Sequence, residues 1–131
     1  MELDKQIYHS LNAGDKGMIR DGMEIALCVI DKVTRQLHFS GVGMGLVYHL
    51  GEEEIYLKGN RGSIGDYQFN EVSFEKNTVR LTGKERFYMA SDGFQDQLGG
   101  QNYKRYSKRR LMDELKAVQH LEAAEQERIL K

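Results

Sequence analysis

The chain contains no proline and no tryptophan, and it has one cysteine among its 131 residues. Without proline there is no proline-rich linker and no PxxP ligand motif, so the 14 glycines must mark the turns. The single cysteine, Cys28, excludes an internal disulfide and a thiolate metal cluster. Because Cys28 lies within the apolar segment 25–30, we expect a packed, inert thiol rather than a nucleophile.

An excess of charge of either sign is also missing. Lysine and arginine together number 19 against 20 for aspartate and glutamate, which gives a formal net charge of −1. No global field therefore attracts nucleic acid or an anionic membrane. The longest apolar run, residues 25–30, is far shorter than the ~18 to 20 residues that a membrane helix needs. The start of the chain lacks the features of a secretory signal, so we expect a cytoplasmic protein without membrane contact from this segment.

Helical spacing near both ends of the chain predicts flanking helices. Apolar residues at positions 3, 7 and 11 share one helical face, which predicts a helix over residues 2–11. Near the other end, Ser107 is a suitable helix cap, and a second helical stretch is expected over residues 122–131. The apolar face of the helix after Ser107 comprises Leu111, Met112, Leu115 and Val118.

Short strands are expected between these helices. Residues 23–30 are apolar on both alternating faces, which predicts a central strand covered on two sides. Further strands are expected over 36–40, 46–50, 55–58, 71–75, 78–82 and 86–90. The glycine cluster 41–45 lacks the spacing of a phosphate-binding loop, so we expect a hairpin bend there. The pattern predicts an α+β protein whose strands form an antiparallel meander.

The apolar strand over residues 87–90 runs directly into an Asp-Gly pair, Asp92 and Gly93. A carboxylate at the end of a rigid strand, next to a glycine that allows close approach, suits a hard divalent cation. An Asp-Gly pair after a strand is also a common turn, and the residues alone leave both interpretations open. The four histidines have no zinc-binding spacing, and we expect each of them to be at the surface or half-buried.

Two segments carry a family resemblance. Residues 91–100, which read Ser-Asp-Gly-Phe-Gln-Asp-Gln-Leu-Gly-Gly, resemble the signature of bacterial serine phosphatases of the SpoIIE and RsbU type, in the metal-dependent PP2C superfamily. Residues 21–31 are similar to the strand that reads Asp-Gly-Met-Asp-Ile-Ala-Leu in this family. Residues 8–12 are similar to the helix end before that strand, so the resemblance covers nearly the whole chain. It identifies Asp92, with Gly93 beside it, as the position that matches a family metal ligand.

The resemblance implies a partial PP2C-like β-sandwich of antiparallel strands with flanking helices. Residues 1–131 would be a single incomplete phosphatase domain, because the N-terminal and C-terminal metal-ligand motifs of the family are absent. A sandwich that lacks strands leaves an open edge, so we expect a homo-oligomer.

The implied reaction is hydrolysis of phosphoserine or phosphothreonine on a regulatory protein in bacterial signalling, with two Mn²⁺ or Mg²⁺ ions in the complete domain. The implied substrate is a phosphorylated anti-anti-sigma (STAS-like) protein that controls a sigma factor. We expect this chain to be inactive alone. The alternative is a non-catalytic, phosphatase-like interaction module.

Five basic residues follow the phosphatase-like motif within seven positions. They are Lys104, Arg105, Lys108, Arg109 and Arg110. Tyr103 and Tyr106 are interleaved with them, a mixture that occurs in nucleic-acid sites, in solvated loops and in surfaces that bind acidic or phosphorylated proteins. The neutral total charge and the lack of a helix-turn-helix pattern argue against nucleic acid. If the cluster has a function, we expect docking of the phosphoprotein substrate.

Overall fold

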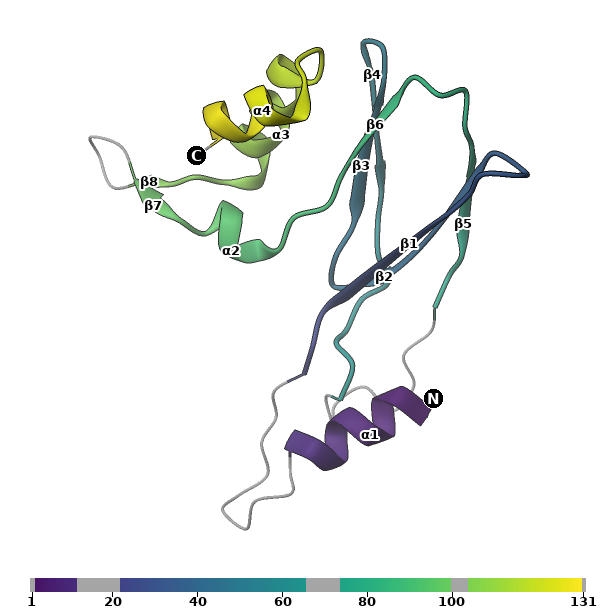
Figure 1. Cartoon of the computed structure of the whole chain (residues 1–131). Helices are drawn as coiled ribbons and strands as arrows, with labels where there is room; N and C mark the ends of the chain where they lie inside the picture. Colours follow the sequence, from purple (N-terminus) through teal and green to yellow (C-terminus); the bar gives the residue numbers. More distant parts are fainter. Residues whose placement is uncertain (1, 12–21, 66–73, 100–103, 131) are drawn as a thin grey trace. The chain divides into compact units, whose positions relative to one another are not determined.

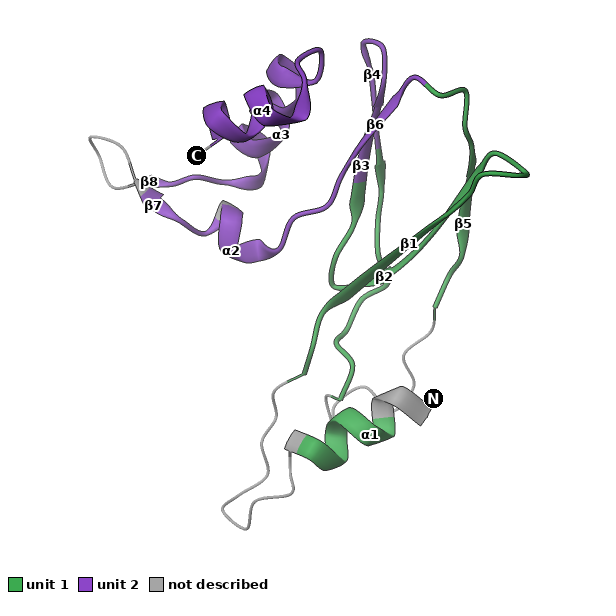
Figure 2. Cartoon of the chain, viewed as in Figure 1, with its two compact units in different colours: residues 1–46, 56–83 green, residues 47–55, 84–131 purple. Residues whose placement is uncertain are grey.

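The computed structural model describes residues 2–11, 22–65, 74–99 and 104–130 (Figure 1). Its helices and antiparallel strands confirm the predicted α+β class. The chain forms two compact units, residues 1–46 with 56–83 and residues 47–55 with 84–131 (Figure 2). None of the helices in the described ranges is long and apolar enough to cross a membrane.

The first unit contains a three-stranded antiparallel sheet in the order β1-β2-β5. These strands are β1 (Ile25–Asp31), β2 (Gln36–Val42) and β5 (Asn77–Arg80). The turn between β1 and β2 closes on Asp31, whose Oδ1 accepts hydrogen bonds from the backbone N–H groups of Val33 at 2.8 Å and Thr34 at 3.0 Å. These bonds lower the pKa of the Asp31 carboxyl, because they stabilise its charged form.

Strand β2 carries the core of the first unit. From residue 36 to residue 41 the strand alternates between half-buried and buried positions, as expected where one face packs inward, and residue 42 is buried as well. Leu37 and Phe39 are at most 1% exposed, and Val42, Leu46 and Ile64 are completely buried. The helix α1 (Glu2–Leu11) belongs to the same unit, and its Ile7 lies against Gly65, because a Cβ added at Gly65 would be 2.6 Å from the Ile7 Cγ2.

The prediction of a covered central strand over residues 23–30 is wrong. Strand β1 lies at one edge of the described sheet, while β2 occupies the centre. Leu27, Val29 and Ile30 are between 50% and 61% exposed. Apolar periodicity shows which side chains of a strand are apolar, but it does not show which other strands pair with that strand.

Cys28 is half-buried, and burial raises the pKa of its thiol, in agreement with an inert cysteine.

The second sheet has the order β4-β3-β6 and lies mainly in the second unit. Its strands are β3 (Leu46–Leu50), β4 (Glu53–Leu57) and β6 (Glu85–Tyr88). After β6 come α2 (Asp92–Gln95), β7 (Leu98–Gly99), β8 (Lys104–Arg105), α3 (Lys108–Val118) and α4 (Ala123–Leu130). Most predicted helices and strands are therefore confirmed within a few residues. Of the strand predicted over 71–75, residues 71–73 lie outside the described ranges and residues 74 and 75 are not in a strand.

His49 corrects the expectation that every histidine is at the surface or half-buried. It is 1% exposed, and its Nε2 lies 3.1 Å from the Glu54 Oε2. Its ring centroid lies 5.5 Å from that of Tyr88 on β6.

In the same unit, helix α3 buries Leu111 and Leu115 together with Val118. The apolar face predicted after Ser107 is thus confirmed, except that Met112 is only half-buried.

Tyr106 links α2 to the first turns of α3. Its ring packs edge-on against Phe94 of α2 with the centroids 5.5 Å apart. Its hydroxyl donates a hydrogen bond to the Glu114 carboxylate, and the Arg110 guanidinium lies 4.8 Å from the ring centroid. Burial and the Glu114 carboxylate raise the pKa of Tyr106 to about 12. This contact holds the short helix that contains Asp92.

The raised pKa of Tyr106 makes the folded state sensitive to alkaline pH. Below pH ~10 the phenol is neutral in both states, so its contribution to stability is fully present. Between pH ~10 and the folded pKa of about 12 only the unfolded phenol ionises, so stability falls. Ultraviolet titration of the wild type minus Tyr106→Phe should show one phenol that ionises near 12. Ionisation of that phenol near the ordinary value would contradict the contact with Glu114.

Among the described strands, β2 alone pairs with β1, so the other edge of β1 has no partner there. We expect self-association through this edge, because an unpaired edge with apolar side chains is a template for another chain. Sedimentation at micromolar concentration should show a species larger than the monomer. Val29→Lys, at a position that is 50% exposed on the edge strand, should shift the protein towards monomer. Val33→Lys is the control, because Val33 is 93% exposed but lies in the turn after β1. A wild-type monomer, or an equal effect of both substitutions, would refute association through β1.

Candidate functional site

Asp92 is the first residue of the short helix α2, four residues beyond the end of β6. Ser91 precedes it with extended backbone, φ −71° and ψ 163°, and acts as the N-cap without a side-chain hydrogen bond. The helix closes when the Asp96 N–H donates to the Asp92 carbonyl at 2.9 Å. The predicted Asp-Gly corner is thus one helical turn, and it leaves the Asp92 side chain exposed.

Gly93 has no steric reason within the described structure to be a glycine. A Cβ added there would meet only the Ser91 Oγ, at the ordinary contact distance of 3.6 Å. By contrast, a Cβ at Gly59 would lie 2.0 Å from the Met44 carbonyl oxygen, so packing does require that glycine. The small residue beside Asp92 is therefore not needed for packing, and it keeps the approach to the carboxylate open.

The residues around Asp92 fit one metal ligand but not a complete metal site. Among the described residues, none forms an ion pair or a hydrogen bond with the Asp92 carboxylate. Asp96, four residues later in the sequence, has its Oδ1 paired with the Arg105 Nε at 3.3 Å. The described ranges contain no group of three or more His, Cys, Asp or Glu side chains suited to a metal ion. Mg²⁺ and Mn²⁺ need several oxygen ligands, so Asp92 would be one contributor.

The basic residues predicted as a docking cluster have different environments. Arg105 of β8 is paired with Asp96, and Arg110 is paired with Glu114, with 3.0 Å between Nε and Oε1. Lys108 and Arg109 are exposed on the first turn of α3, after the Ser107 cap, and Lys104 begins β8. Arg105 and Arg110 are thus ion-paired within the chain. Exposed ion pairs of this kind contribute only about 0 to 1 kcal/mol, so an external anion can compete for both arginines.

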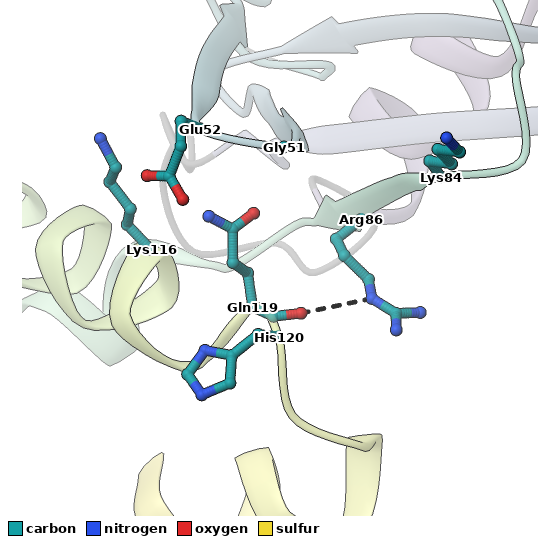
Figure 3. Close-up of a pocket in the computed structure, with 7 residues that line it drawn as sticks. All are labelled: Gly51, Glu52, Lys84, Arg86, Lys116, Gln119 and His120. Carbon is teal, nitrogen blue, oxygen red and sulfur yellow. Dashed lines mark hydrogen bonds between the residues drawn. The ribbon is translucent and has the colours of Figure 1, made fainter.

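A second group of cations lines a pocket that no sequence motif indicated. The pocket lies within the second unit and has a volume of about 390 Å³ (Figure 3). Its lining residues are Gly51, Glu52, Lys84, Arg86, Lys116, Gln119 and His120. They come from the turn between β3 and β4, the start of β6 and the end of α3. Because these segments are far apart in the sequence, only the fold brings their charges together.

Comparisons with known proteins agree with the fold and with the family resemblance. The sequence matches the family model described as Stage II sporulation protein E (SpoIIE) over residues 1–130. No curated protein matches the sequence. The structure is similar to the solved SiaA-PP2C domain of Pseudomonas aeruginosa, with a TM-score of 0.82 and 30% sequence identity. This alignment covers 97% of the present chain and 48% of the solved chain, so the present chain spans about half the length of that structure.

The family match extends over both predicted segments, the one that resembles the family strand at residues 21–31 and the one that contains Asp92. The structural match shows in addition that the solved PP2C domain has a similar arrangement of strands and helices. The chain therefore belongs to the SpoIIE family of PP2C-like phosphatase domains.

Proposed function

We propose that this chain provides part of the active site of a metal-dependent protein phosphatase, which hydrolyses phosphoserine or phosphothreonine on a regulatory protein. The observation that supports this proposal most strongly is the position of Asp92. It is an exposed carboxylate without a partner among the described residues, next to a glycine that packing does not require. Membership of the SpoIIE family adds the reaction class.

The proposed metal is Mn²⁺ or Mg²⁺, with two ions in the complete domain. When bound, the ions would activate a water molecule and stabilise charge on the phosphoryl oxygens. Asp92 would give one carboxylate to this site, and Gly93 would leave room beside it. Since the described residues offer no cluster of three ligands, we propose that the chain alone has negligible activity.

The proposed substrate is a phosphorylated anti-anti-sigma (STAS-like) protein, and the proposed location is the cytoplasm. Lys108 and Arg109 are the exposed cations nearest to the Ser107 cap of α3, and Tyr106 connects that turn to the helix of Asp92. A phosphoprotein with an acidic surface would be attracted to these cations. Such attraction acts mainly on association and orientation, so it complements the metal site without replacing it.

A second candidate function is a non-catalytic interaction module of the same fold. The observation that favours it is the lack of a metal cluster in the described ranges. Such a module would bind its protein partner without Mn²⁺, and Asp92→Asn would leave that binding unchanged. The proposed phosphatase instead predicts that Asp92 binds metal, which distinguishes the two functions without an activity assay.

The first prediction concerns Asp92. The chain should bind Mn²⁺ weakly, with a dissociation constant of about 1 mM or higher, because one carboxylate provides few ligands. Binding is measured by the decrease of the free Mn²⁺ signal in electron paramagnetic resonance. Asp92→Asn should abolish this decrease. Asp113→Asn is the matched control, because it removes an exposed carboxylate from α3 in the same unit. Equal Mn²⁺ binding by the wild type and Asp92→Asn would remove Asp92 from the metal site.

Activity measurements complete this test. The chain with Mn²⁺ and a phosphoserine peptide should show negligible release of phosphate. In a complete domain that supplies the remaining metal ligands, Asp92→Asn should reduce phosphatase activity at least about 100-fold. This loss is larger than the typical effect of removing a residue that only hydrogen-bonds to a metal ligand. Turnover by the chain alone that disappears in Asp92→Asn would show that its own residues complete the site, contrary to our proposal.

The next prediction concerns docking. The double variant Lys108→Gln and Arg109→Gln should weaken binding of a phosphorylated STAS-domain protein about threefold to tenfold, because each exposed charge contributes up to about 1 kcal/mol. The variant should also show a shallower dependence on salt, measured by titration calorimetry. Arg110 is kept, since it contacts Tyr106 and Glu114. Tight, steeply salt-dependent binding of DNA to the wild type would instead support a nucleic-acid surface.

A further inference from the structure

Helix α2 is a single turn, so it cannot fix the direction of the Asp92 side chain by itself. Its backbone begins with a hydrogen bond from the Phe94 N–H to the Ser91 carbonyl at 3.3 Å. It closes with the bond from the Asp96 N–H to the Asp92 carbonyl at 2.9 Å. The first turn of a helix is costly to form, and isolated helices shorter than ~12 residues are marginal in water. The conformation around Asp92 therefore depends on contacts with other parts of the second unit.

Contacts of three kinds tie α2 and the residues after it to β8 and the residue that follows β8. The Phe94 ring packs edge-on against the Tyr106 ring, with the centroids 5.5 Å apart. The Tyr106 backbone N–H donates to the Gln97 carbonyl oxygen at 2.9 Å. The Asp96 Oδ1 lies 3.3 Å from the Arg105 Nε. The ring contact is made by a residue inside α2, whereas Asp96 and Gln97 follow the helix.

The contact of Phe94 with Tyr106 determines which way Asp92 points. Phe94 follows Asp92 by two positions in α2. Successive residues of an α-helix are rotated by about 100°, so side chains two positions apart point in nearly opposite directions. A Phe94 ring held against Tyr106 therefore turns the Asp92 carboxylate away from Tyr106. In agreement, Phe94 is half-buried and Asp92 is exposed.

Tyr106 is itself held by side chains of α3. Its hydroxyl donates a hydrogen bond to the Glu114 carboxylate, and the Arg110 guanidinium lies 4.8 Å from the centroid of its ring. Arg110 and Glu114 are also paired with each other, with 3.0 Å between Nε and Oε1. Because α3 carries a buried apolar face, this closed cluster of three side chains has a rigid support.

We propose that Tyr106 is a positioning residue for Asp92. Phe94 connects the Tyr106 ring to the turn, while Arg110 and Glu114 hold that ring in place. The inference rests on the proposed function, because it takes Asp92 as a ligand of Mn²⁺ or Mg²⁺. Metal ligands must be held within about 0.5 Å of their productive position by side chains that are themselves fixed. Tyr106 would act through Phe94 and not by contact with the metal ion.

The first measurement needs neither metal nor substrate. In the whole chain, ¹⁵N relaxation should give the amides of residues 92–94 order parameters of about 0.85, the value of a rigid backbone. Tyr106→Leu removes the ring contact and should lower these values below about 0.6. Tyr106→Phe keeps the ring and should retain the wild-type values, although it removes the hydrogen bond to Glu114. This rescue by the conservative variant distinguishes positioning by the ring from a general effect on stability.

Phe87→Leu is the matched control. It removes a different aromatic contact of the same unit, between Phe87 on β6 and Tyr48 on β3, whose centroids are 5.6 Å apart. It leaves the ring contact of Phe94 intact, so the order parameters of residues 92–94 should not change. Phe94→Leu removes that ring contact from the other side and should lower the order parameters as Tyr106→Leu does. It replaces Tyr106→Leu if the circular dichroism of that variant differs from the wild type.

The second measurement is Mn²⁺ binding by a complete domain that supplies the remaining metal ligands. Tyr106→Leu should raise the dissociation constant of Mn²⁺ about tenfold in that domain. This is the lower end of the usual effect of residues that support metal ligands from outside, because Tyr106 acts through one further side chain. Tyr106→Phe should bind Mn²⁺ like the wild type.

Three results would overturn the proposal. The first is that residues 92–94 have the same order parameters in the wild type, Tyr106→Leu and Phe94→Leu. The second is that Phe87→Leu lowers these values as much as Tyr106→Leu does. The third is that Tyr106→Leu leaves Mn²⁺ binding by the complete domain unchanged. Failure of the proposed function is distinguishable, because Asp92→Asn would then bind Mn²⁺ normally while Tyr106→Leu would still lower the order parameters.

Discussion

Pairing between strands that are distant in the sequence is the constraint on which the rest of this structure depends. The centre of each three-stranded sheet, β2 or β3, pairs on one side with its neighbour in the chain and on the other with a later strand, β5 or β6. The pairing of β3 with β6 places Val47 opposite Tyr88 and Leu50 opposite Glu85. Because that register positions β6, it also positions the helical turn of Asp92 and the pocket at its opposite ends.

Beyond one end of β6, the chain forms the helical turn that contains Asp92. The contact of Phe94 with Tyr106, and of Tyr106 with Glu114, connects that turn to α3. Near the other end, Arg86 reaches the C-terminal carbonyl of the same helix. Helix α3 is therefore linked to the segments on either side of β6, and its buried leucines stabilise the arrangement.

The helical turn of Asp92 and the pocket differ in how the sequence encodes them. Asp92 and Gly93 are adjacent and follow an apolar strand, so a continuous motif carries the signal. The cations of the pocket come from separate segments and belong to no motif. In the sequence each of those cations has the pattern of an ordinary surface residue, and only the fold brings it to the lining of one pocket. In the same way, the fold pairs Arg105 on β8 with Asp96, which lies two residues before β7, the strand that pairs with β8.

The sequence by itself determined the α+β class, most helices and strands, the Ser107 cap and the resemblance to the phosphatase family. These features depend on local spacing and on contiguous motifs, which are visible in one chain. The tertiary structure alone decided that β1 lies at a sheet edge, that His49 is buried against Tyr88, and that three cations share one pocket. Those features depend on which distant segments pair, and apolar periodicity is the same for a strand at the edge and for one at the centre.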